Sequence, residues 1–183
     1  DWLEEVQVLA PMYRGPCGVD NLNELLRAKL PQRKGLIDDQ PMLLRGRPWR
    51  VGERVLHTRN DYERDVFNGD MGRIVRLVDA PRGLEVRFPE RTLFYAESQL
   101  ADLTPAFAIT VHRSQGGEYP AVVLPLVTSH ALMLQRHLLY TAVTRAKRLC
   151  VLVGQQRALE LAVSNARQAE RFSALAERLQ ALP

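Results

Sequence analysis

AITVHRSQGGEYP, residues 108–120, runs directly into AVVLPLV, residues 121–127, and these two stretches decide the fold class. A short apolar strand is expected to enter a polar turn rich in Thr, His, Ser and Gln before a second apolar strand begins. Continuous apolar runs, unlike alternating ones, are typical of parallel strands that helices cover on both faces. The stretch therefore predicts an α/β domain built on a parallel sheet.

The segments before this stretch follow the same pattern. VQVLA, residues 6–10, predicts a buried strand that ends at Pro11, and the helix behind it has leucines at helical spacing before Pro31. Asp20 or Asn21 is the expected N-cap of that helix.

The segments after residue 127 complete the α/β pattern. A helix is expected from about His130 to Ala146, then the strand LCVLVG (149–154), then helical segments from about Gln155 to Leu182, packed on their own domain or on a partner. Cys150 is expected to be a small buried apolar residue, and the chain has no CxxC pair, so neither a zinc site nor any other metal site is predicted.

Residues 49–103 show a different pattern, with short β-forming runs separated by turn signals such as Asn68-Gly69. This spacing predicts a small antiparallel barrel. We expect one α/β domain made of residues 1–48 and 104–183, with the barrel of residues 49–103 inserted into it. Residues 31–48, rich in Pro, Gly, Arg and Asp, are expected to form a connector or loop.

The composition is that of a globular protein. Of the 183 residues, 46% are hydrophobic and 25% are charged, which excludes disorder, collagen and a coiled coil. No apolar run approaches the roughly 20 residues that span a bilayer, and the first residues lack the features of a signal peptide, so we expect a cytoplasmic location and no membrane partner. The net charge is +4, and only three of the 25 cations are lysines. The planar donors of arginine suit a polyanionic partner, although a genome rich in G and C explains the same excess.

Two interpretations fit the turn of residues 110–118. Its hydroxyls, amides and backbone N–H groups can meet phosphate oxygens. Alternatively, Thr110 and Ser114 satisfy the backbone of an ordinary capping turn and His112 is a structural histidine.

Arginines stand out in two other loops. Lys147 and Arg148, near the end of the helix that precedes LCVLVG, are expected to be partners of the helix dipole, whereas Arg145 can project toward a triphosphate as an arginine finger does. Arg14 follows the first strand, where open α/β sheets place their ligands, and it is either a phosphate contact or a surface residue.

These segments resemble the motifs of one family. TVHRSQGGEYPAVVLP (110–125) resembles motif V of superfamily 1 helicases, YTAVTRAK (140–147) resembles motif VI, and VLAPMYRGPCGVDNLN (8–23) resembles the motif IV region of the RecD-like subgroup. VGERVLHTRNDYERDVFNGDMGRIVRL (51–77) resembles the SH3-like barrel that interrupts the second motor domain, of P-loop-NTPase-like (RecA-like) fold, in RecD-like and TraA-like helicases of superfamily 1B. The resemblance extends to about Gln156 and includes the α subunit of exodeoxyribonuclease V.

The resemblance implies a role for each matching residue. Arg145 matches the motif VI arginine that stabilises the γ-phosphate during hydrolysis, and Arg14 matches a second γ-phosphate contact in motif IV. The nucleotide-side candidates are Gly116, Glu118 and Tyr140. The DNA-side candidates in the motifs are Thr110, His112, Ser114, Gln115 and Thr144. On the barrel, Arg59 and Asn60 are candidates from their chemistry and not from the resemblance, because arginine can meet the phosphates of a single strand. A rigid spacer or a protein-docking module, with its arginines merely solvated, is the alternative for the barrel. Arg113 and Gly117 stand where family members often have Lys and Ser.

The sequence contains no GxxxxGK[ST] loop, the element that cradles phosphates and helps to bind magnesium. The resemblance therefore implies that ATP and Mg²⁺ are bound mainly by a missing N-terminal motor domain, and that the present chain alone is inactive. It implies 5′ to 3′ unwinding of DNA, with single-stranded DNA and single-strand/duplex junctions as partners, in a stand-alone helicase or together with RecB/RecC-type subunits. A non-catalytic module that binds DNA or protein is the alternative.

Overall fold

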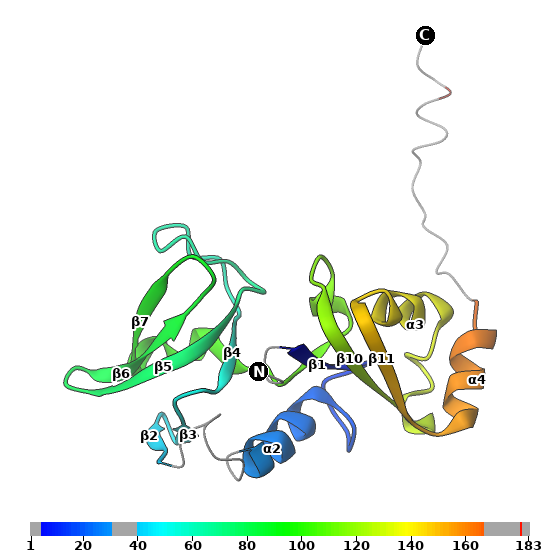
Figure 1. Cartoon of the computed structure of the whole chain (residues 1–183), viewed down its shortest axis with the longest axis horizontal. Coiled ribbons are helices and arrows are strands. Elements are labelled where there is room, and N and C mark those ends of the chain that lie inside the picture. The colour runs from blue at the N-terminus through cyan, green and yellow to red at the C-terminus, as the bar shows by residue number, and fades with distance from the viewer. Residues whose placement is uncertain (1–4, 31–39, 167–179, 181–183) are drawn as a thin grey trace.

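The computed structural model describes residues 5–30, 40–166 and 180, and it contains the predicted parallel sheet. All paired strands of this sheet run parallel, in the order β11-β10-β1-β9 (Figure 1). The strands are β1 (Val6–Ala10), β9 (Ala108–Thr110), β10 (Tyr119–Leu126) and β11 (Ala146–Gly154). We call these strands and their helices the parallel unit.

Among the described residues, three α-helices accompany this sheet: α2 (Val19–Lys29), α3 (Arg136–Val143) and α4 (Gln156–Ser164). The N-cap of α2 is Gly18, so the prediction of Asp20 or Asn21 is wrong; the Asn21 side chain instead donates to the Pro16 carbonyl oxygen across 2.7 Å. The rest of the helical segment expected up to Leu182 lies outside the described residues, apart from Gln180.

The helix expected from His130 begins only at Arg136. Residues Thr128–His130 form a 3₁₀ turn, η4, and the backbone N–H of Leu134 still donates to the Ala131 carbonyl, so the chain makes successive tight turns before α3. His130, Leu134 and Leu138 are all buried. Their apolar periodicity thus reflects burial against the core and not one continuous helix.

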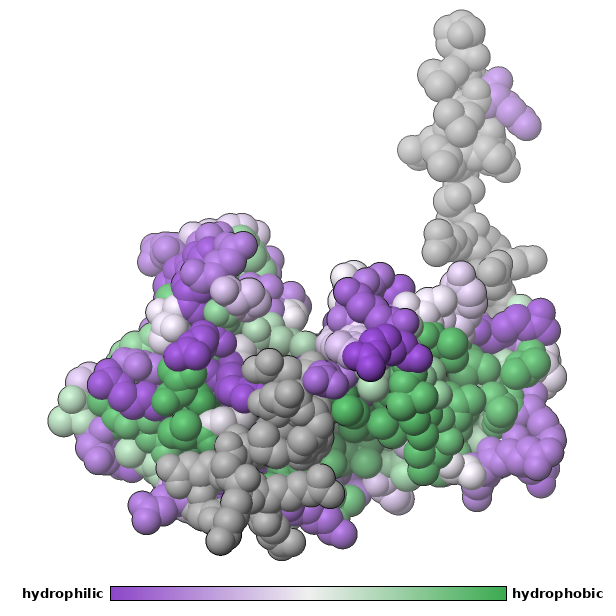
Figure 2. Space-filling model, in the orientation of Figure 1, coloured by the Kyte–Doolittle hydropathy of each residue, from purple (hydrophilic) through white to green (hydrophobic). Residues whose placement is uncertain are grey.

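The apolar core of the parallel unit lies between the sheet and the helices α3 and α4. The expectation that helices cover both faces of every strand is wrong for β11, which is an edge strand. Leu149 and Val153 are 55% and 52% exposed, and Figure 2 shows apolar surface over β10 and β11. Among the described helices on the other face, α2 packs on β9, where Asn23 exchanges two hydrogen bonds with the backbone of Ala108. Cys150 is only partly buried, and this burial raises the pKa of its thiol.

Residues 42–105 form the antiparallel unit. Its five-stranded sheet has the order β7-β6-β5-β4-β8, and closure into a barrel stays a prediction. The strands are β4 (Arg54–His57), β5 (Met71–Asp79), β6 (Arg82–Arg87), β7 (Thr92–Ala96) and β8 (Leu103–Pro105), with the 3₁₀ segment η2 (Glu97–Asp102) between the last two. The expected connector instead contains a hairpin of β2 (Met42–Leu44) and β3 (Arg47–Trp49), whose Leu44 and Trp49 enter the core of this unit.

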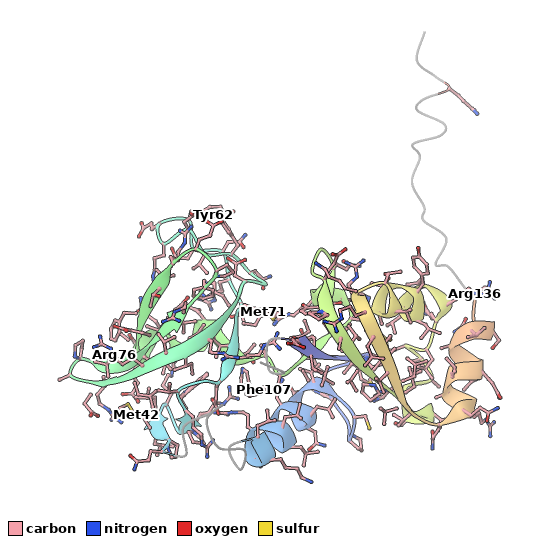
Figure 3. The ribbon with its side chains drawn as sticks, in the orientation of Figure 1. Met42, Tyr62, Met71, Arg76, Phe107 and Arg136 are labelled. Atoms are coloured by element: carbon pink, nitrogen blue, oxygen red, sulfur yellow. The ribbon has the colours of Figure 1, made fainter. Side chains whose placement is uncertain are left out.

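The chain leaves the parallel unit after α2 and returns to it at β9. Polar side-chain contacts also join the two units. Arg27 of α2 contacts both carboxylate oxygens of Glu53, at 3.0 and 2.9 Å, and both side chains are buried. Arg54 donates to the Val6 carbonyl oxygen and to the Gln7 side chain. Met71, which packs against the core of the parallel unit, lies at this junction in Figure 3.

Candidate functional site

Arg145 connects the motif V segment to the end of α3. Its Nη1 donates to the Gly117 carbonyl oxygen (3.0 Å), its Nε to the Thr141 carbonyl oxygen (3.2 Å) and its Nη2 to Thr144 Oγ1 (3.3 Å). The Arg145 carbonyl oxygen accepts from the Tyr119 backbone N–H (2.8 Å). The guanidinium is therefore fixed at the amino end of β10 and β11.

The other nucleotide-side candidates surround this arginine. Glu118 forms an ion pair with Lys147 (3.2 Å), and both side chains are more than half exposed. Lys147 is thus a strand residue with an acidic partner, and the prediction that it serves a helix dipole is wrong. Tyr140 is exposed on α3, and its carbonyl oxygen accepts from the Thr144 N–H. Gly116 has φ +83°, a conformation that favours glycine.

The DNA-side candidates of motif V lie at the carboxyl end of β9 and divide into two groups. Thr110 and Ser114 are buried: Thr110 Oγ1 accepts from the Arg113 N–H (3.2 Å), and Ser114 Oγ donates to the Val111 carbonyl oxygen (2.7 Å). The capping-turn interpretation therefore holds for Thr110, which satisfies a backbone donor, whereas the Ser114 hydroxyl satisfies a backbone acceptor. His112 and Gln115 are exposed, so His112 is not a structural histidine.

The loop that carries Arg14 lies beside this turn. The Val111 N–H donates to the Ala10 carbonyl oxygen, which joins the ends of β9 and β1. The guanidinium carbon of Arg113 is 5.7 Å from the ring centroid of Tyr13, and Arg14 is exposed next to it. No local sequence pattern relates Tyr13 to Arg113, because the two residues are a hundred positions apart in the chain.

Arg14 and Arg145 follow and precede strands at opposite ends of the parallel sheet. Val6 pairs with Ala121, so Ala10 lies about six residues, roughly 20 Å, beyond the level of Tyr119 along the parallel strands. Arg14 follows Ala10 at the carboxyl end, whereas Arg145 adjoins Tyr119 at the amino end. Contact of both arginines with one γ-phosphate stays a prediction.

The two candidates on the antiparallel unit have structural partners. Arg59 pairs with Asp102 (3.3 Å), and Asn60 Oδ1 accepts from the Asn68 N–H (3.0 Å). Tyr62, labelled in Figure 3, is 77% exposed and contacts Phe67 edge to face. A DNA-side role for Arg59 and Asn60 stays a prediction.

Within the described ranges, no three His, Cys, Asp or Glu side chains gather into a possible metal site. The same residues include no helix that is long and apolar enough to cross a membrane.

Comparisons with known families agree with the two-unit architecture. Residues 105–153 match the family described as the UvrD-like helicase C-terminal domain, and residues 22–88 match the SH3 domain of ATP-dependent RecD-like DNA helicases. The chain belongs to the RecD-like helicase family. Its fold is accordingly a RecA-like helicase domain combined with a RecD-like SH3 domain.

Curated RecD-like relatives match nearly the whole chain. The ATP-dependent RecD2 DNA helicase of Deinococcus radiodurans is 37% identical over 96% of this chain, and the RecBCD enzyme subunit RecD of Mycobacterium tuberculosis is 36% identical over 97%. The chain spans 24% and 29% of these two proteins, so it corresponds to about a quarter of their length.

Solved helicase structures share the fold of this RecD-like chain. A Pif1 helicase from Bacteroides, in complex with ADP-AlF3 and single-stranded DNA, aligns over 99% of this chain and 46% of its own, with a TM-score of 0.57 and 19% identity. A structure of Pif1 helicases at forked duplex DNA aligns over 81% of this chain and 39% of its own, with a TM-score of 0.56 and 21% identity.

Proposed function

We propose that this chain supplies one side of an ATPase site and part of a single-stranded DNA track in a longer RecD-like DNA helicase. The observation that carries the proposal is the position of Arg145, held at the amino end of the sheet by the motif V and motif VI segments. His112 and Gln115 are exposed on the turn that follows the carboxyl end of β9. Motif V thus links a nucleotide side to a DNA side.

The donors of Arg145 suit a phosphate. A guanidinium has five N–H groups, and the three hydrogen bonds of Arg145 use one on each nitrogen. One N–H therefore remains on Nη1 and one on Nη2, the pair that contacts phosphate in a bidentate way. We assign this pair to the γ-phosphate of ATP, with Glu118 and Tyr140 beside it.

The residues present fit one side of an ATP site only. Arg145 and Lys147 bring two cations to the turn of Gly116–Glu118. ATP, when bound, supplies the free energy of hydrolysis that drives movement. No described carboxylate cluster suits Mg²⁺, so we assign the metal and the P-loop to another part of the longer protein.

Coupling between the two sides follows from motif V itself. The carbonyl that Arg145 holds belongs to Gly117, and the turn that ends there begins at Thr110, next to His112. A shift of Arg145 toward a nucleotide therefore moves the segment that carries the exposed DNA-side residues. We propose that cleft closure is transmitted to DNA along this path, with 5′ to 3′ movement as in superfamily 1B.

The names of relatives and neighbours suggest the partners. Pif1 structures contain single-stranded and forked DNA, and several relatives are RecBCD subunits. We propose single-stranded DNA and its junctions with duplex as substrates, the bacterial cytoplasm as the location, and RecB/RecC-type subunits as partners if the longer protein does not act alone.

The test uses the longer helicase that contains this chain. Arg145→Ala should reduce DNA-stimulated ATP hydrolysis by about a thousandfold or more, because a transition-state arginine contributes that much, while affinity for single-stranded DNA persists. Arg148→Ala, an exposed arginine on β11, is the matched control and should leave hydrolysis unchanged. Near-normal turnover of Arg145→Ala would rule out this role.

A further inference from the structure

Tyr13, Arg14 and Arg113 gather at the carboxyl end of the parallel sheet, beside the exposed His112. We propose that these three residues form a base-stacking subsite for single-stranded DNA, in which one base stacks on Tyr13 and the flanking phosphates contact Arg14 and Arg113. This inference rests on the proposed DNA-binding function and adds a named subsite to it.

The ring of Tyr13 is accessible and already part of a cation–π contact. It is 44% exposed, and the Arg113 guanidinium carbon is 5.7 Å from its centroid. A large aromatic side chain at a surface gains free energy when a base stacks on it, and any base can do so because every base has a π face. A guanidinium beside the ring meets the phosphate that follows the stacked base.

Hydrogen bonds hold the backbone of the loop that carries Tyr13. The Val19 N–H donates to the Met12 carbonyl oxygen (3.0 Å), and the Asp20 N–H donates to the Tyr13 carbonyl oxygen (3.1 Å). A Cβ at Gly18 would lie less than 3.0 Å from the carbonyl oxygens of Tyr13 and Arg14, so only glycine lets the chain pass there. A backbone fixed before binding reduces the conformational entropy that the loop loses when a base stacks on the ring.

The charge around the ring favours a polyanion. The backbone N–H of Arg113 donates to Thr110 Oγ1, and the Arg113 guanidinium lies over the Tyr13 ring. Within the described residues, no ion pair engages Arg14 or Arg113. Both cations therefore remain available to phosphates.

The test measures binding of the 183-residue chain to two fluorescent probes at low salt: an oligothymidylate of about eight nucleotides and an abasic oligonucleotide of the same length. Tyr13→Leu should weaken binding of oligothymidylate by about five- to a hundredfold and leave binding of the abasic probe unchanged. Tyr13→Phe keeps the ring and should bind as the wild type does. Tyr62→Leu, which removes an exposed tyrosine of the antiparallel unit, is the matched control and should have no effect.

The arginines are tested through salt dependence. Arg14→Ala and Arg113→Ala should each reduce the slope of log affinity against log salt by about 0.7, the value for one phosphate contact to a single strand, whereas Arg148→Ala should not. Two results with a wild-type chain that binds DNA would overturn the subsite alone. In the first, Tyr13→Leu binds oligothymidylate as well as the wild type does; in the second, it loses affinity for both probes equally. A wild-type chain that binds neither probe overturns the proposed DNA track, and the subsite with it.

Discussion

Arg145 Nη1 donates to the Gly117 carbonyl oxygen across 3.0 Å, and this bond joins the turn before β10 to the end of α3. The two residues belong to segments 28 positions apart in the chain. Because the same guanidinium also contacts Thr141 and Thr144, the arginine that we assign to the γ-phosphate is also a structural link.

Replacement of Arg145 should therefore lower stability as well as activity. Arg145→Ala in the 183-residue chain should lower the free energy of unfolding by about 1–2 kcal/mol, since net contributions of single hydrogen bonds are modest. Arg145→Lys should recover only part of this loss, because one ammonium cannot reach three acceptors that diverge. Urea unfolding measures the effect, with Arg148→Ala as the control expected within about 0.5 kcal/mol of wild type. An unchanged midpoint for Arg145→Ala would mean that these contacts do not stabilise the fold.

The buried pair of Arg27 and Glu53 should be the most sensitive contact between the two units. Its side chains are 10% and 1% exposed, and Arg27 also donates to the Pro48 carbonyl oxygen. Glu53→Leu alone should cost about 3–5 kcal/mol, because it leaves the buried Arg27 without a carboxylate, whereas Arg27→Met should cost less, because Arg50 Nη1 remains 3.5 Å from Glu53. The double variant should recover most of that loss, which a double-mutant cycle by urea unfolding measures. Additive losses would show that the two residues act independently.

The strands of the parallel unit are predicted well from the sequence, because a buried strand appears there as a continuous run of apolar residues. VQVLA, AVVLPLV and LCVLVG all lie in parallel strands of one sheet. The hairpin of β2 and β3 is missed because its strands have three residues each, too few for an alternating pattern. The signal that identifies it is Arg45-Gly46, both with positive φ, between MLL and RPW.

The candidate site is predicted only in part, for a different reason. Motifs V and VI identify His112, Glu118 and Arg145 as site candidates from the sequence. Strand register, which the sequence does not show, decides the end of the sheet at which each loop lies. The pairs Tyr13–Arg113 and Glu118–Lys147 arise from tertiary contact, which leaves no local pattern. The hydroxyls of Thr110 and Ser114 match the family motif, yet in this chain both make local backbone contacts.

Acid should weaken the antiparallel unit through His57. Burial lowers the pKa of His57 below its ordinary value of 6.5, and its Nδ1 is 3.2 Å from Tyr95 Oη. The unfolded chain takes up this proton near pH 6.5 and the folded chain only at lower pH, so stability is complete above that value and falls as pH drops through the folded pKa. Burial also lowers the pKa of His130, so this residue contributes to the loss of stability in acid as well.

Urea unfolding between about pH 7.5 and pH 5 tests this dependence. His57→Asn should reduce the slope of stability against pH. The same slope in wild type and His57→Asn would assign the acid sensitivity to other groups.

Two glycines should respond differently to an added side chain. A Cβ at Gly83 of β6 would lie less than 3.0 Å from the Tyr95 carbonyl oxygen and 2.7 Å from Phe94 Cζ, so backbone of the paired strand β7 would have to move. A Cβ at Gly117 would lie 3.0 Å from Tyr119 Oη, the end of a side chain that can shift by a few tenths of an ångström. Gly83→Ala should therefore cost about 1–3 kcal/mol, as overpacking does, and Gly117→Ser less than about 1 kcal/mol. Thermal unfolding of both variants measures the difference, and an equal loss of melting temperature in the two would show that contact with backbone does not decide the cost.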